Sequence, residues 1–86
     1  MTYVVYVEAV MDKDVVDWDY DTIENIISTH KLTQDEVIEK ALKNTLNFLE
    51  EVYGMSENVV KYTKATIIGV VDNNVFKVVD DNVFKD

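Results

Sequence analysis

The segment Thr2–Met11, "TYVVYVEAVM", decides the expected fold because it is typical of a β-strand with two apolar faces. Valine and tyrosine favour strands, and alternate side chains of a strand point to opposite sides of its sheet. One side would carry Tyr3, Val5, Val7 and Ala9, and the other would carry Val4, Tyr6, Glu8 and Val10. Two largely apolar faces indicate a strand at the centre of a sheet, or a strand covered by a second chain.

The clearest helix is predicted from Gln34 to Tyr53. The preceding "TQDE" at Thr33–Glu36 has the capping-box pattern, in which the first and last side chains bond each other's backbone N–H groups. Gly54 suits the left-handed residue that ends many helices. Apolar or small residues recur at helical spacing at Val37, Ile38, Ala41, Leu42, Thr45, Leu49, Val52 and Tyr53.

A second, shorter helix is predicted ahead of that one. "DTIE" at Asp21–Glu24 also fits the capping-box pattern, and Ile23, Ile26 and Ile27 follow the i, i+3, i+4 spacing of an apolar stripe. His30 would then lie in the last turn, where the helix macrodipole favours a cation. These patterns predict a short helix directly after an acidic segment.

The residues from Val59 onward are predicted to form antiparallel strands. Asn73 and Asn74 suit a two-residue hairpin turn because asparagine tolerates positive φ. The sequence "VDNNVFK" at 71–77 returns as "VDDNVFK" at 79–85, which predicts a second turn and a short final strand. The order is then β-α-α-β-β, with that short strand last. We expect one α+β domain over residues 1–86, with its helices packed on one face of a mostly antiparallel sheet. The opposite face would need a cover, so a homodimer is also expected.

The charge of the chain restricts its ligands. Seventeen acidic residues and eight lysines give a net charge of −9. Neutralising phosphates requires clustered basic residues, so nucleic acid and anionic membranes are not expected as direct ligands. The expected ligand is a basic protein. Without cysteine the chain forms no disulfide, which fits a reducing cytoplasm. No apolar run approaches the ~18–20 residues that cross a bilayer.

Most of the excess charge surrounds "DKDVVDWDYD" at Asp12–Asp21, because residues 8–24 carry seven acids and one lysine. We expect folding to gather these acids on one outward surface. In an extended segment, alternate aspartates would be about 6.6 Å apart and form a row of negative charge. Tryptophan and tyrosine are favoured interface anchors. The predicted partner-binding residues are Asp12, Asp14, Asp17, Trp18, Asp19, Tyr20, Asp21 and Glu24. The alternative is a solvated loop whose Trp18 and Tyr20 fold back into the core.

No catalytic residue, metal site or cofactor is predicted. Asp17, Asp19 and Asp21 match three calcium-ligand positions of an EF-hand loop, but Thr22 and Ser28 stand where that loop needs glycine and glutamate. The chain has one histidine, no cysteine and neither a nucleophile motif nor a glycine-rich phosphate loop. The sequence therefore indicates a protein that is not an enzyme.

The predicted function is an acidic protein-binding module that inhibits or modulates a basic, nucleic-acid-binding host protein. DNA mimicry is its sharpest form, with carboxylates in place of phosphates. The chain is similar in size and charge to small acidic bacteriophage proteins that block host DNA-binding proteins, a likeness of general character without a shared motif. Its many asparagine and lysine residues and its lack of proline fit an AT-rich coding sequence. The alternative is a structural or assembly subunit that self-associates through its sheet.

Overall fold

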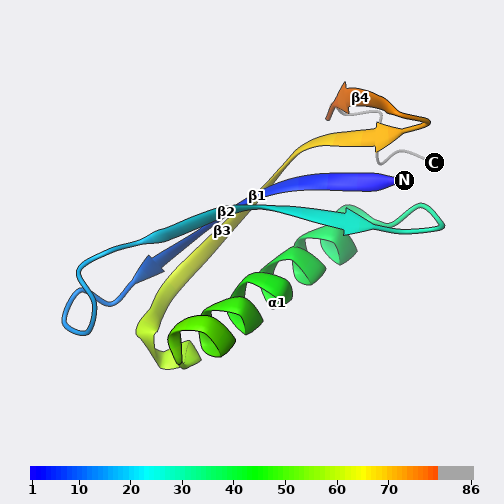
Figure 1. The fold of residues 1–86 in the computed structure, drawn as a ribbon. Helices are drawn as coiled ribbons and strands as arrows, with labels where there is room; N and C mark the ends of the chain where they lie inside the picture. Colours follow the sequence, from blue (N-terminus) through cyan, green and yellow to red (C-terminus); the bar gives the residue numbers. More distant parts are fainter. Residues whose placement is uncertain (80–86) are drawn as a thin grey trace.

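One long helix crosses one face of a four-stranded antiparallel sheet in the computed structural model, which describes residues 1–79 (Figure 1). The strands lie in the order β2-β1-β3-β4. The elements are β1 (Thr2–Met11), β2 (Tyr20–Ile27), α1 (Gln34–Tyr53), the short 3-10 helix η1 (Glu57–Val59), β3 (Val60–Asp72) and β4 (Val75–Val78). The expected α+β class is confirmed, with the order β-β-α-β-β.

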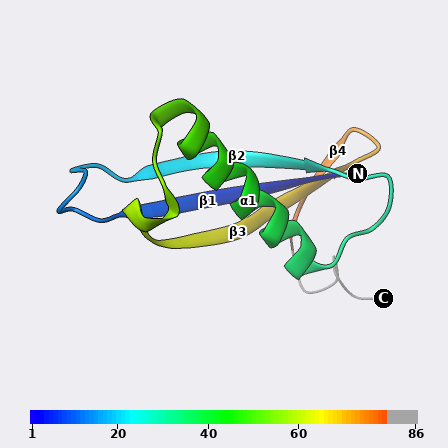
Figure 2. The same ribbon diagram turned by 90° about the horizontal axis from the view of Figure 1, so that it is seen from below.

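Strand β1 is the centre of the sheet, as its two apolar faces predict. It pairs antiparallel with β2 on one side and with β3 on the other. Its helix-facing residues are fully buried, and they are Tyr3, Val5, Val7, Ala9 and Met11. Figure 2 shows α1 lying across this face of the sheet. The residues between them point away from α1 and are only partly covered.

Helix α1 begins and ends where its sequence predicts. The Thr33 hydroxyl accepts a hydrogen bond from the Glu36 N–H at 3.2 Å, and the Glu36 carboxylate accepts one from the Thr33 N–H at 3.1 Å. Gly54 ends the helix in the left-handed region with φ 66°, where a Cβ would be strained. The buried stripe consists of Val37, Ala41, Thr45 and Leu49.

Replacing Thr33 with alanine should destabilise the chain by about 1 kcal/mol. The substitution removes the side-chain acceptor of the Glu36 N–H, a helix-end donor that has no partner within the helix. Urea unfolding followed by circular dichroism measures the loss. Thr29→Ala is the matched control, because Thr29 is an exposed threonine in the segment before the helix and caps nothing. Equal stabilities of the two variants would contradict the capping role.

The helix predicted from Asp21 is wrong, because these residues form β2. Opening a short helix fixes several residues for one hydrogen bond, whereas β1 offers an eight-residue backbone ladder to the same segment. Its isoleucines and Thr22 are β-branched and favour a strand. His30 is therefore exposed in the connection to α1 and lies in no helical turn.

The hairpin predicted at Asn73 and Asn74 is confirmed, since these residues have φ values of 50° and 64° and join β3 to β4. A Cβ at Gly69 would collide with the Phe76 ring, so glycine allows that ring to lie over β3 on the face away from α1. The predicted final strand falls on the second copy of the repeat and lies outside the described residues. Within residues 1–79, no helix is both long and apolar enough to cross a membrane.

Candidate functional site

The acidic segment forms the loop that joins β1 to β2, and the loop is held by its own first aspartate. The Asp12 N–H donates to the Val59 carbonyl at 2.8 Å, which ties the loop to η1. The Asp12 carbonyl accepts from the Val16 N–H at 3.0 Å, and its carboxylate accepts from the Asp14 N–H at 2.9 Å. The Asp12 side chain therefore shapes the turn.

Asp19 is bound by groups of its own chain. Its carboxylate forms an ion pair with the Lys13 ammonium and accepts a hydrogen bond from the Met11 N–H at 3.1 Å. The hydrogen bond from Lys13, followed by that from Met11, lowers the pKa of Asp19 below its ordinary value. Part of the charge of the loop is thus neutralised within the protein.

We expect the Asp19 carboxyl to titrate below the ~3.9 of a free aspartate. Because the folded pKa is lower than the unfolded one, the carboxylate stabilises the fold above pH ~4, and this contribution is lost as the pH falls through the folded pKa. Carbon-13 NMR titration measures it. In Lys13→Met the pKa of Asp19 should rise toward the free value, while Lys61→Met should leave it unchanged. An unaltered pKa in Lys13→Met would contradict the assignment.

Asp14 and Asp17 are the unengaged acids of the loop. Both are exposed, and neither side chain forms a hydrogen bond or ion pair with another residue of the described chain. An open hollow of about 350 Å³ beside Asp14 is lined also by Lys13 and Lys61, so the outer side of the loop carries mixed charge. Asp14 and Asp17 are the two carboxylates that a partner could reach without displacing an internal contact.

Asp21 and Glu24 on β2 do not join that loop surface, and neither does Glu8 on β1, so the expectation of one outward acidic surface is wrong for these three. Asp21 and Glu24 lie three residues apart, and a strand sends such side chains to opposite faces. Asp21 accepts a hydrogen bond from the Tyr6 hydroxyl at 2.9 Å on the face away from α1, which raises the pKa of Tyr6. Glu24 accepts one from the Thr45 hydroxyl at 3.3 Å on the face covered by α1.

Trp18 and Tyr20 join a group of four aromatic side chains that we call the aromatic cluster: Trp18, Tyr20, Phe48 and Tyr53. The ring of Trp18 lies 5.4 Å from that of Tyr53, and Tyr20 stacks on Phe48 at 5.6 Å. Phe48 meets Tyr53 edge-on at 6.1 Å. The cluster links the end of the loop to the last turns of α1.

The aromatic cluster is anchored in the core but remains partly open. Trp18 and Tyr20 pack on the buried Ala9, Met11 and Leu49, as the alternative of a fold-back into the core predicts. They are only half-buried, and Phe48 and Tyr53 are 39% and 51% exposed. Phe48 was not among the predicted site residues, because it lies outside the buried stripe of α1. The one signal for it in the sequence is a large aromatic side chain at a helix position that the core does not need.

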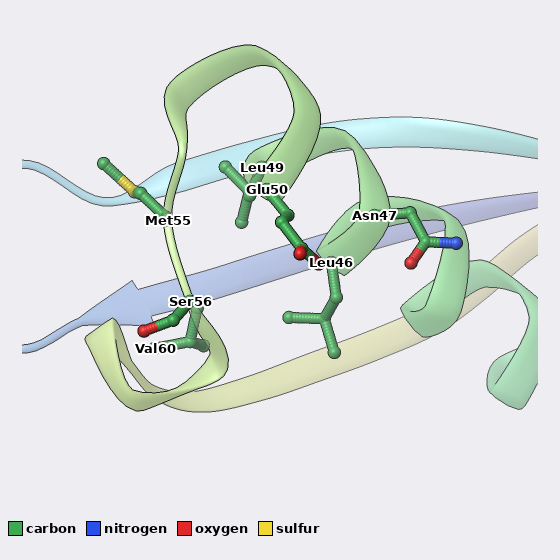
Figure 3. A pocket seen from close by; sticks show the side chains of 7 residues that line it. All are labelled: Leu46, Asn47, Leu49, Glu50, Met55, Ser56 and Val60. Atoms are coloured by element: carbon green, nitrogen blue, oxygen red, sulfur yellow. The ribbon is translucent and has the colours of Figure 1, made fainter.

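The hollow beneath the end of α1 has room for water rather than for a substrate (Figure 3). Its volume is about 30 Å³, above the ~10–15 Å³ that a cavity needs to hold one water molecule. The lining residues are Leu46, Asn47, Leu49, Glu50, Met55, Ser56 and Val60. Among residues 1–79, no three His, Asp or Glu side chains are grouped so as to hold a metal ion.

The predicted site residues that remain together therefore form two groups, the loop acids and the aromatic cluster. Both groups lie at one end of the molecule, because Figure 1 shows the loop beside the last turns of α1. Comparison with known proteins found no matching family model, no matching curated protein and no matching solved structure.

Proposed function

We propose that this chain is a non-enzymatic binding module that inhibits or modulates a basic, nucleic-acid-binding protein through the β1–β2 loop and the aromatic cluster. The observation that carries the proposal is the combination of the two unengaged carboxylates, Asp14 and Asp17, with partly exposed aromatic rings at one end of the molecule. Protein interfaces typically surround aromatic anchors with a polar rim.

Each half of this surface has a separate role in binding. The aromatic cluster supplies contact area that loses water on association, and its rings are already fixed by stacking, so little side-chain entropy is lost. The exposed acids, with the net charge of −9, attract a basic surface and accelerate the encounter. A nucleic-acid-binding protein offers such a surface. In the DNA-mimic form of the proposal, which suits a phage-encoded inhibitor, the loop acids occupy the phosphate sites.

A competition experiment tests this function. Proteins captured from a bacterial lysate by the immobilised chain are identified, purified and tested for binding to the chain and to labelled duplex DNA. We expect a basic DNA- or RNA-binding protein whose nucleic acid is displaced by the chain. The affinity should fall at least about tenfold as salt rises from about 0.05 M to about 0.5 M, because exposed charges are screened.

A basic protein that binds no nucleic acid is the control for unspecific charge attraction. Equal affinity for the control and for the captured protein would overturn the proposal, as would simultaneous binding of the captured protein to the chain and to its nucleic acid. The second candidate, a subunit that self-associates through its sheet, is favoured by the exposed apolar side chains of Ile23, Tyr62 and Phe76 on the sheet face away from α1.

A further inference from the structure

The face of the sheet opposite α1 carries apolar side chains that remain exposed. Ile23 on β2, Tyr62 on β3 and Phe76 on β4 are 50%, 57% and 52% exposed. Further exposed apolar residues on this face are Ile27 and Val78. Figures 1 and 2 show α1 on the other side of the sheet. Monomeric proteins rarely leave a large contiguous apolar area open, so this face is typical of an interaction surface.

The charged residues of the open face differ in sign from one strand to the next. Glu8 on β1 lies between Asp21 on β2 and Lys64 on β3 in the antiparallel register, so the three form a row across the sheet. Neither Glu8 nor Lys64 forms an ion pair with another residue in the described part of the chain. The β2 and β1 positions of the row are therefore acidic, and the β3 position is basic.

We propose that a second copy of this chain covers the open face, with a two-fold axis parallel to the strands and between β1 and β3. This rotation lays β1 on the partner's β3 and β2 on the partner's β4. Residues that pair side by side within one sheet then lie at the same height along the strands as the same residues of the partner. Glu8 then opposes the partner's Lys64. At the opposite end of the sheet, where Ile27, Thr2, Val71 and Phe76 form one row, Ile27 opposes the partner's Phe76.

An axis across the strands gives a poorer match. Such an axis, passing across the middle of β1, would turn one sheet end for end relative to the other. Glu8 and its neighbours in the row would then face the partner's Val4 and the residues beside it. Charged groups would then be buried without partners, which destabilises an interface.

The size of the face is sufficient for a stable dimer. The molecule measures 43 × 22 × 19 Å, and the sheet extends along the longest dimension. Its strands of 8, 10, 13 and 4 residues project roughly 550 Å² at ~3.3 Å per residue and ~4.8 Å between strands, and the relief of the side chains brings the accessible area into the range of about 600–1,000 Å² per partner that is typical of specific complexes. The same axis places both β1–β2 loops at one end, so the dimer presents two acidic loops together. This surface is separate from the loop surface proposed to bind a basic protein.

Salt should tighten the dimer. Each copy carries a net charge of −9, and the two acidic loops lie at the same end, so repulsion between copies outweighs the Glu8–Lys64 attraction. Screening reduces that repulsion. Light scattering over a range of concentrations and salt should show a dimer that strengthens with salt, the reverse of the expected partner binding. A monomer at all concentrations would overturn the dimer and leave the proposed function intact.

Charge exchange tests the pairing across the interface. Glu8→Lys and Lys64→Glu each place like charges opposite each other twice in a dimer, so each variant alone should dimerise about tenfold more weakly or worse. Their equal mixture places opposite charges together and should restore a heterodimer. Circular dichroism checks that both variants fold. A mixture that associates no better than its components would contradict the pairing.

Single cysteines test the orientation of the axis, because the chain has none of its own. Tyr62→Cys and Val71→Cys lie about 26 Å apart along β3, because they pair with Val10 and Thr2 near the two ends of β1. With a thiol cross-linker that spans the ~10 Å between packed sheets, each variant should link to its own copy, and the mixture should yield no 62–71 product. A dominant 62–71 product would indicate the axis across the strands. Failure of both variants to link would show that copies meet elsewhere, for example along the edge of β2.

Discussion

Replacing Leu49 with alanine is expected to lower the free energy of unfolding by about 2–5 kcal/mol. Leu49 is 1% exposed and lies on the buried side of α1, where it packs against Ala9 and Met11 of β1. This part of the core supports Trp18 and Tyr20. The substitution removes buried contacts and leaves a cavity, because β1 is held from both sides and cannot move in to fill it. A chain of this length is expected to have only about 4–13 kcal/mol of stability in total.

Val52→Ala is the matched control, because it removes aliphatic carbon from the same helix at a site that is 57% exposed. This substitution should change the free energy of unfolding by no more than about 0.5 kcal/mol. Urea unfolding measures both variants. The emission of Trp18, the one tryptophan, should also shift toward the red in folded Leu49→Ala, because its support loosens. Equal losses in the two variants would contradict the placement of Leu49 in the core.

The sequence predicts β1 and α1 in full because each has two agreeing signals. For β1, β-branched and aromatic composition agrees with two apolar faces. For α1, the apolar stripe agrees with capping residues at both ends. The turn at Asn73 and Asn74 was also predictable, since positive φ limits the choice of residue.

The sequence does not predict β2, because residues 20–27 fit both the apolar spacing of a helix and the alternating pattern of a strand. Only pairing with β1, which the sequence alone does not show, decides for the strand. Glu24 matches a capping box in the sequence, yet in the fold it bonds the Thr45 hydroxyl from the neighbouring layer. The same limit applies to the candidate site. The sequence places the aspartates in one segment, but the pairing of Asp19 with Lys13 and of Asp21 with Tyr6 arises from turn geometry and strand register.

Changing Asp12, Asp14, Asp17 and Asp19 together to asparagine should weaken binding of the basic partner up to roughly 30-fold. Exposed ion pairs contribute up to about 1 kcal/mol each, so the pairs made by the unengaged Asp14 and Asp17 amount to up to about 2 kcal/mol. Asp12 and Asp19 are already bonded within the loop and add only to the general attraction. The fold should survive, because an asparagine oxygen can still accept from the Asp14 N–H and the Met11 N–H. Titration calorimetry measures affinity, and urea unfolding confirms that stability is retained. Unchanged affinity would exclude the loop as the binding site.

The double variant Asp14→Asn/Asp17→Asn separates a binding surface from general charge attraction. These two carboxylates have no described internal partner, whereas those of Asp12 and Asp19 are engaged by the loop itself, so the double variant should produce most of the loss of the quadruple one. Asp35→Asn/Glu39→Gln removes the same charge from exposed positions on α1, at the end far from the loop. If affinity depends on net charge alone, both doubles weaken binding equally. If the partner contacts the loop, the loop double should lose about tenfold more, because Coulomb interactions at a contact exceed those screened over more than ~10 Å.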